Sequence, residues 1–354
     1  MENKCILPFV RHDEWRNSPC CKIQNFDYKK DLSRLLDDHN ENKQSKFCTV
    51  CWDFEKQGVW SKRQESNQHF KNLGLNISKI KKRSIKSLVI PTGNVCNLSC
   101  VYCCSFYSSS WKLKDEYLNK KNINTNNTFN LASIDKFNDI EWKDIIDIEL
   151  QGGETLMSKN LWQILDLART DTSISLLSNG TVKLKEKHIQ QIQKFKNLYI
   201  TLSIDGIGKI FEYCRRPAKW DQVKNNIEEY KKIFSPYRVS FQVTISSLNI
   251  FYIDKIMLDL IKILPSYSNI NIITSPSTMS PSTLTPNIGS IIEKNNPFFF
   301  KTRKIHWQGN DNTMKNFLDY ISLQDTYDKM TMQEYLPEFF ELIREQYPHH
   351  LHKM

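Results

Sequence analysis

Three cysteines, Cys96, Cys100 and Cys103, stand at the spacing C-x3-C-x2-C. Thiolates are the usual ligands of iron–sulfur clusters, and a four-iron cubane that receives only three of them keeps one iron open to another ligand. A zinc site with a fourth ligand elsewhere, or cysteines buried in a core, are the alternatives. Zinc sites usually combine paired C-x2-C or C-x2-H arms, and a run this dense at the exit of a strand suits core packing poorly. The spacing therefore favours a 4Fe-4S cluster.

The elements that must position this loop alternate between strand and helix patterns. Segments rich in β-branched and apolar residues predict six strands, at 87–92, 145–151, 173–178, 198–204, 238–246 and 269–274. Helical patterns lie between them, at 131–142, 159–169, 183–195, 219–233 and 251–264. This alternation predicts a parallel α/β fold, an open doubly wound sheet or a partial (β/α)6 barrel of the TIM type, and we expect the barrel. In both folds, ligands bind beyond the carboxyl ends of the strands.

The chain divides into three predicted parts. Residues 1–84 form a small cysteine-rich module without convincing strand–helix alternation, and residues 85–275 form the barrel. Residues 276–354 form a helical extension that we expect on the substrate side, with a proline-rich loop at 276–298 and two helices within 311–346.

Composition limits the class of protein. The chain has 354 residues, 40% of them hydrophobic and 25% charged, which is ordinary for a folded globular protein. It shows no secretory signal and no stretch near the ~18 apolar residues of a membrane span, so we expect it in the cytoplasm. Thiols are kept reduced there, so the ten cysteines indicate metal ligands before disulfides. The net charge of +10 would favour nucleic acid, but the one local cluster of basic residues, 79–86, is interpreted as a solvated linker.

Followed by Ser108-Ser109-Ser110-Trp111, the cysteine loop resembles that of radical S-adenosylmethionine (radical SAM) proteins, notably phage-associated ones with a twitch or SPASM-like auxiliary domain. The resemblance covers most of residues 1–250. It implies that S-adenosylmethionine chelates the open iron and that an electron, from a donor such as flavodoxin or ferredoxin, breaks its sulfonium bond. The resulting 5′-deoxyadenosyl radical would take hydrogen from a substrate. For a phage-encoded protein the location would be the host cytoplasm.

A second motif follows the second predicted strand. Gln151-Gly152-Gly153-Glu154 resembles the glycine–glycine–glutamate motif of the family, although Thr155 stands where proline is frequent. The resemblance implies that backbone without side chains approaches the amine of the cofactor and that Glu154 accepts a hydrogen bond from it. Taken alone, the same residues would be an ordinary turn.

Other cofactor contacts are implied by the resemblance after later strands. Ser178-Asn179 and Ser203-Ile204-Asp205 resemble ribose and carboxylate contacts, though as sequence alone they are turns. Arg215, preferred over Arg216, would pair with the carboxylate of the cofactor. Tyr102 would pack on the adenine side, and Cys214 is interpreted as a core residue.

The amino-terminal cysteines look like a twitch-type auxiliary module placed before the barrel. Cys5, Cys20, Cys48 and Cys51 would hold a second 4Fe-4S cluster, with Cys21 as the rival of Cys20. A C-x2-C arm with two further cysteines is also the pattern of a zinc ribbon, so both metals stay open. The histidines of this region are not at a paired spacing and are interpreted as surface or packing residues: His12, His39 and His69.

Two classes of function follow. The favoured one is a radical SAM enzyme acting on a peptide, a nucleotide-derived compound or a small metabolite, because fold alone does not select a substrate. The alternative is a basic, cysteine-rich metal-binding protein that binds nucleic acid without catalysis. This alternative explains neither the β/α core nor the motifs after its strands.

Overall fold

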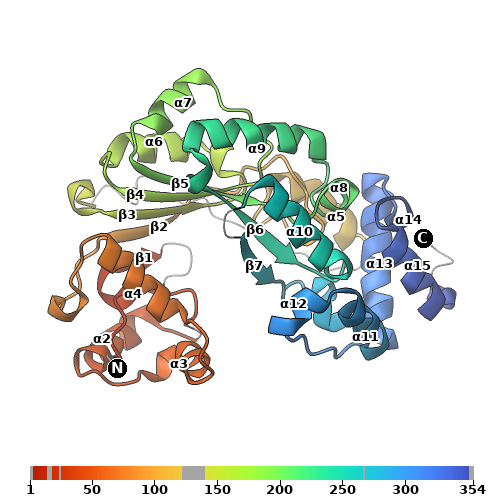
Figure 1. Ribbon diagram of the computed structural model, residues 1–354, viewed down its shortest axis with the longest axis horizontal. Coiled ribbons are helices and arrows are strands. Elements are labelled where there is room, and N and C mark those ends of the chain that lie inside the picture. Colours follow the sequence, from red (N-terminus) through yellow and green to blue (C-terminus); the bar gives the residue numbers. More distant parts are fainter. Residues whose placement is uncertain (1–2, 14–17, 24, 122–139, 266–267, 351–354) are drawn as a thin grey trace.

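The computed structural model describes residues 3–13, 18–23, 25–121, 140–265 and 268–350. Its centre is a seven-stranded sheet in which all strands are parallel and follow one another in chain order. The strands are β1 (Arg11–Asp13), β2 (Ser87–Pro91), β3 (Asp147–Gln151), β4 (Ser173–Ser178), β5 (Asn197–Ser203), β6 (Val239–Ile245) and β7 (Ser268–Ile272). The sheet forms a half-barrel, so the predicted α/β partial barrel is confirmed (Figure 1).

The six predicted strands are β2 to β7, each within two residues of its predicted bounds. The seventh strand, β1, was not predicted, because Arg11, His12 and Asp13 show no apolar alternation. It pairs with β2 at the edge of the sheet, with Arg11 opposite Ser87. The amino-terminal region is thus joined to the barrel by backbone hydrogen bonds.

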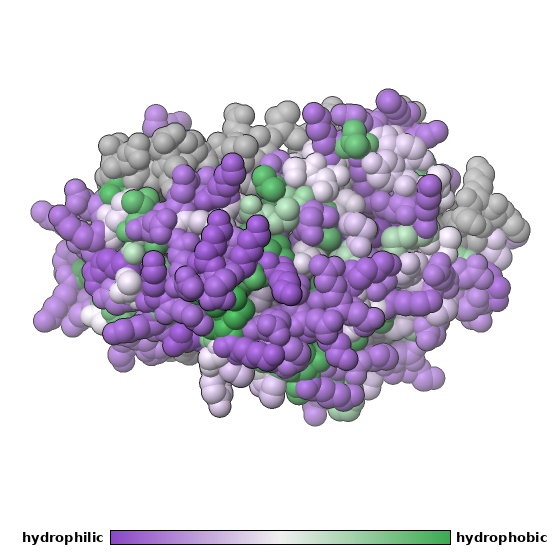
Figure 2. Space-filling model, turned by 90° about the horizontal axis from the view of Figure 1, so that it is seen from above, coloured by the Kyte–Doolittle hydropathy of each residue, from purple (hydrophilic) through white to green (hydrophobic). Residues whose placement is uncertain are grey.

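Four predicted helices are present: α6 (Lys159–Leu167), α7 (Glu186–Gln193), α9 (Trp220–Phe234) and α10 (Ile253–Ile263). Most of the helix expected at 131–142 lies outside the described residues, and a short helix not predicted, α8 (Lys209–Cys214), follows β5. Figure 1 shows α6, α7 and α9 on one side of the sheet. They turn apolar side chains toward it, as Val223, Ile227 and Tyr230 of α9 illustrate by helical spacing and burial. Figure 2 looks onto their outer side, which is mostly hydrophilic with small hydrophobic areas.

The amino-terminal region is helical. Its helices are α1 (Leu7–Val10), α2 (Tyr28–Asn40), α3 (Thr49–Lys56) and α4 (Lys62–Asn72). Asp27 caps α2, and Ser61 with Gln64 forms a capping box on α4, so both helices begin at side chains that satisfy free backbone N–H groups. A small core that includes Cys5, Cys20, Phe9 and Phe70 lies between the helices, separate from the core of the barrel.

The carboxy-terminal region differs from the prediction. The loop expected at 276–298 contains α11 (Pro286–Asn295) and the start of α12 (Pro297–Thr302), because each proline occupies a first helical turn, where its missing N–H breaks no hydrogen bond. Three helices, not two, follow: α13 (Asp311–Asp328), α14 (Met332–Tyr335) and α15 (Pro337–Gln346). Among the described residues, no helix has the length and apolar character needed to cross a membrane.

Candidate functional site

The cysteines Cys96, Cys100 and Cys103 lie between β2 and α5 (Lys112–Asn119) and line one cavity of about 200 Å³. Cys100 is buried, and the other two are half-buried. Burial raises the pKa of all three thiols, to about 12 for Cys100, whose rise is opposed by the positive charge of Arg215. Such thiols ionise when a bound metal supplies compensating charge, so the donor set suits a metal centre.

Residues from five separate segments of the chain meet at this cavity. Four of the segments lie at the carboxyl ends of parallel strands, which share one edge of the sheet, and the fifth contributes Arg215 after α8. Seven of the nine predicted cofactor contacts line it: Tyr102, Gly152, Gly153, Ser178, Asn179, Ser203 and Arg215. The other two, Glu154 and Asp205, are fully buried and absent from the lining. Four lining residues were not predicted as contacts: Leu98, Tyr107, Ser108 and Leu177.

Both glycines after β3 are required by close backbone approach. A Cβ atom on Gly152 would lie 2.5 Å from Thr92 Oγ1, and one on Gly153 would lie 2.6 Å from Val95 O. Gly153 N donates to Gly93 O at 2.8 Å. The glycines therefore pack β3 against the start of the cysteine loop, a role in addition to the approach of a ligand that the motif implied.

Glu154 holds the turn after β4. Its Oε1 accepts from Ser178 Oγ at 2.8 Å and from Leu156 N at 3.1 Å, and its Oε2 accepts from Asn179 N at 2.6 Å. Burial raises the pKa of this carboxyl group, and these hydrogen bonds lower it. The carboxylate thus presents Ser178 and Asn179 to the cavity, and the predicted direct contact between Glu154 and a ligand amine stays a prediction.

Asp205 plays a matching part after β5. Its Oδ2 lies 2.6 Å from Arg215 Nε and also accepts a hydrogen bond from Tyr102 Oη, and its Oδ1 accepts from Thr244 N at 2.6 Å. Burial raises the pKa of Asp205, and Arg215 opposes that rise. Asp205 thus fixes the guanidinium group of Arg215 and the ring of Tyr102 at the cavity wall. One buried carboxylate therefore orients two of the predicted cofactor contacts.

The cysteine loop is held by the end of α8 and the segment that follows it. Ser99 N donates to Arg216 O at 2.7 Å, and Val101 N donates to Cys214 O at 3.0 Å. Cys214 is fully buried in the core of the barrel, as predicted from sequence. The backbone on both sides of Cys100 is therefore held by hydrogen bonds to buried neighbours.

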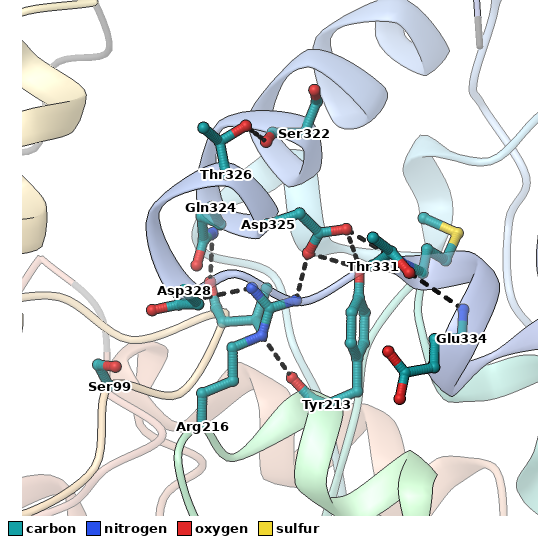
Figure 3. Close-up of polar contacts among 12 residues, drawn as sticks. Ser99, Tyr213, Arg216, Ser322, Gln324, Asp325, Thr326, Asp328, Thr331 and Glu334 are labelled. Carbon is teal, nitrogen blue, oxygen red and sulfur yellow. Dashed lines mark hydrogen bonds and ion pairs between the residues drawn. The ribbon is translucent and has the colours of Figure 1, made fainter. Parts of the chain in front are cut away.

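Helix α13 reaches the same loop through buried charges (Figure 3). Arg216 Nη2 donates to Asp325 Oδ1 at 2.6 Å, and Arg216 Nη1 donates to Asp328 Oδ2 at 2.9 Å. Tyr213 Oη donates to Asp325 Oδ1 at 3.0 Å. Lys114, fully buried on α5, lies 2.5 Å from Asp328. Two cations and two carboxylates thus form a network that joins α5, the segment after α8 and α13.

Two polar residues of the site were missed by sequence reasoning. Gln324 of α13 donates from Nε2 to Val101 O at 2.9 Å, directly in the cysteine loop. Asn97, which follows the first cysteine, accepts from Asn179 Nδ2 at 3.0 Å and donates to Thr181 Oγ1 at 2.8 Å. The position of Asn97 between two ligand candidates was a usable signal, whereas nothing near Gln324 in the sequence connects it to this loop.

The geometry can be compared with known proteins. Residues 90–260 match the family model described as the radical SAM superfamily. These residues are a radical SAM domain. Among curated proteins, none matches the chain.

Solved structures resemble the chain over part of its length. Native anSMEcpe with bound AdoMet is 18% identical, with a TM-score of 0.42, over 60% of this chain and 59% of that chain. Streptococcus suis SuiB bound to S-adenosylmethionine is 11% identical, with a TM-score of 0.42, over 74% of this chain and 62% of that chain. TYW1 with a lysine–pyruvate adduct is 11% identical, with a TM-score of 0.33, over 60% of this chain and 74% of that chain. The chain thus spans about three fifths of the length of the first two structures.

The family implies a 4Fe-4S cluster and S-adenosylmethionine, and the residues of the radical SAM domain fit both. Cys96, Cys100 and Cys103 supply the thiols, and the same cavity offers glycine backbone, two hydroxyl groups, an amide and the Arg215 guanidinium. No three His, Cys, Asp or Glu side chains of the described residues are placed to bind one metal ion. In a cubane each cysteine binds a different iron, so its ligands need not converge on one point.

The amino-terminal cysteines come from separate elements that meet beside the small core. Cys5 and Cys20 belong to that core, Cys51 lies buried on α3 and Cys48 is half-buried just before it. Burial raises the pKa of Cys5, Cys48 and Cys51, whereas the raised pKa of Cys20 is caused first by a hydrogen bond with Cys21 and then by burial. Cys5 also raises the pKa of both Cys20 and Cys48 through its charge, as expected for thiols that lie near one another. Cys21 is exposed.

His39 is buried among these thiols. Its Nδ1 accepts from Cys5 N at 3.4 Å, and its Nε2 lies 3.8 Å from Cys48 Sγ. Burial lowers the pKa of His39 to about 4, so the ring is neutral at pH 7. His69, by contrast, is 43% exposed and pairs with Asp147 at 2.9 Å. His39 and His69 therefore have different surroundings, and of these two only His39 contacts a candidate metal ligand.

Proposed function

We propose that the protein is a radical SAM enzyme whose 4Fe-4S cluster is bound by Cys96, Cys100 and Cys103. The cluster supplies one-electron cleavage of S-adenosylmethionine, which yields the 5′-deoxyadenosyl radical that abstracts hydrogen from a substrate. The observation that carries the proposal is that the three thiols and seven predicted cofactor contacts line the same cavity. Independent strands bring these residues together, and this convergence is the support that sequence spacing alone lacked.

The residues around the cavity would bind and orient the cofactor. Arg215, held by Asp205, presents a guanidinium group suited to a carboxylate. Ser178 and Asn179, held by Glu154, present a hydroxyl and an amide suited to ribose or carboxylate oxygens. Glu154 and Asp205 then act as positioning residues, and their own hydrogen bonds to the cofactor remain part of the proposal.

The test uses anaerobically reconstituted protein with dithionite as the reductant. Cys100→Ala should abolish release of 5′-deoxyadenosine, because a cubane with two thiolates is not retained at this site. Cys104→Ser is the matched control: Cys104 neighbours Cys103 but does not line the cavity, so this variant should keep the wild-type rate. Release at the wild-type rate by the Cys100 variant would refute the ligand assignment.

The amino-terminal module, residues 1–84, is proposed to bind a second 4Fe-4S cluster through Cys5, Cys20, Cys48 and Cys51. The clustering of these thiols and the exposure of Cys21 support this set. Replacing Cys48 and Cys51 together by serine should lower the iron content from about eight to about four per chain. Loss of zinc at constant iron content would show a structural zinc site in its place.

A further inference from the structure

His39 is a buried side chain that contacts two of the amino-terminal cysteines and that the proposed function leaves without a role. It is 1% exposed and lies near the end of α2, with one ring nitrogen toward the backbone of Cys5 and the other toward the sulfur of Cys48. A buried imidazole usually has both nitrogens paired, so each contact defines the role of the other.

The contact with Cys5 sets the tautomer. A neutral imidazole carries one N–H group and one lone pair. Because Nδ1 accepts a hydrogen bond from Cys5 N, the proton resides on Nε2, the atom 3.8 Å from Cys48 Sγ. A nitrogen that carries a proton cannot bind a metal, so His39 faces Cys48 as a hydrogen-bond donor and not as a ligand.

The other thiols of the group face backbone donors. Lys22 N donates to Cys20 Sγ at 3.4 Å. The backbone N–H groups of Leu7 and Arg63 are directed at the sulfurs of Cys5 and Cys51. At Cys48 an imidazole side chain fills the corresponding place. The hydrogen bond to Cys48 can therefore be removed by a side-chain substitution without altering the backbone.

We propose that His39 is a positioning residue that donates an Nε2–H···S hydrogen bond to the metal-bound thiolate of Cys48 and raises the reduction potential of the amino-terminal cluster. The inference rests on the second cluster proposed above. A hydrogen bond to a ligand sulfur stabilises negative charge on the cluster, and reduction adds one electron, so the reduced form gains more than the oxidised form.

The experiment is a redox titration of the full-length, reconstituted protein followed by electron paramagnetic resonance. His39→Phe keeps a ring but removes the N–H group, and it should lower the midpoint potential of the amino-terminal cluster while the core cluster stays unchanged. His39→Gln retains an N–H donor and should restore part of the shift. His69→Phe is the matched control, because His69 lies in the same module but pairs with Asp147, and it should titrate like the wild type.

A second measurement does not depend on the folding of a variant. In protein labelled with ¹⁵N-histidine, pulsed electron paramagnetic resonance of the reduced amino-terminal cluster should show a weak nitrogen coupling that Cys48→Ser removes. A strong coupling, typical of a directly bound nitrogen, would overturn the inference, as would no coupling or an unchanged potential in His39→Phe. A wild-type protein with about four irons per chain would instead refute the second cluster itself.

Discussion

The two groups of cysteines are built differently. In the barrel, Cys96, Cys100 and Cys103 come from one short loop, and they line an open cavity. The backbone of this loop donates a hydrogen bond to the carbonyl group of Arg216. In the amino-terminal module, the thiols come from separated positions and are gathered by the packing of short helices around a small apolar core. The first arrangement leaves room beside the thiols for a further ligand.

The difference indicates what each group is suited to do. An open cavity next to three thiols suits a metal centre that must admit a small molecule, whereas burial beside an apolar core suits a centre with a closed ligand shell. Each region also relies on a buried arginine: Arg216 pairs with Asp325 and Asp328, and Arg63 pairs with Glu55 at 2.7 Å. These arginines allow the two regions to be perturbed separately.

The largest effect is expected from Arg216→Met. The substitution leaves two carboxylates, Asp325 and Asp328, without their shared cation in a buried site, and breaking such a pair costs roughly 3–5 kcal/mol of the free energy of unfolding. Retention of the core iron should weaken, because the Arg216 side chain no longer anchors the backbone carbonyl that accepts from Ser99 N. Chemical denaturation and iron analysis measure both effects.

Arg63→Met is the matched counterpart. It should lower the metal content of the amino-terminal module and leave cleavage of S-adenosylmethionine by the core intact. If Arg63→Met removed the core cluster as well, the two regions would not be independent, and the comparison would fail.

A smaller effect is expected from Glu154→Gln. The substitution places an amide where Ser178 Oγ and Asn179 N now donate to a carboxylate. Losing charge-assisted hydrogen bonds worth roughly 1.5–3 kcal/mol would weaken S-adenosylmethionine binding about ten- to hundredfold. The visible spectrum of the cluster should be retained, because Glu154 does not line the cavity. An anaerobic titration that gave wild-type affinity would show that Glu154 does not position Ser178 and Asn179 for the cofactor.

Gly153→Ala should act through the loop and not through the cofactor. The added Cβ would lie 2.6 Å from Val95 O and 2.7 Å from Asn94 O, so the cysteine loop must move. Overpacking of this kind costs about 1–3 kcal/mol. We expect a lower melting temperature and weaker retention of core iron. Gly74→Ala, where an added Cβ meets no atom within 4 Å but the backbone is left-handed, controls for loss of glycine freedom.

Local patterns predicted much of this architecture. Apolar, β-branched runs separated by amphipathic segments indicated β2 to β7, and parallel strands then required the motifs after them to meet. The spacing of Cys96, Cys100 and Cys103 likewise predicted a group of three thiols on one loop, and these cysteines line one cavity. The helices α11 and α12 were missed because proline at a first helical turn resembles proline in a loop.

Long-range polar contacts could not be predicted. Gln324 and Asp328 look like ordinary polar residues of an amphipathic helix, yet they contact Val101 and Lys114, more than two hundred residues earlier. The burial of Glu154 beneath the turn that it supports is another such contact, because a single motif does not show which of its residues face a ligand. Partners of this kind are fixed only when the tertiary fold is known.

The effect that is smallest near neutral pH concerns a buried lysine. Lys114 is fully buried, and burial lowers its pKa to about 8, although Asp328 opposes the shift. Between pH 8 and 10.5, the ordinary pKa of a lysine, the unfolded chain binds a proton that the folded protein has released. Stability contributed by this group therefore rises with pH across that window.

Lys114→Met removes the titration and keeps much of the side-chain volume. The free energy of unfolding of the wild type, relative to this variant, should be constant below pH 8 and then increase by at most about 1.4 kcal/mol per pH unit up to pH 10.5. Other groups that titrate in this range, the cysteines included, are common to both proteins, so they cancel in the difference. Lys315→Met, which removes an exposed lysine paired with Asp319 on α13, controls for the loss of a surface charge. Denaturation at pH 7, 8, 9 and 10 gives the test. A difference in the free energy of unfolding that stays constant from pH 7 to 10 would mean that Lys114 remains charged throughout. The carboxylates of the network around Arg216 would then compensate the burial of Lys114 more fully than its lowered pKa indicates.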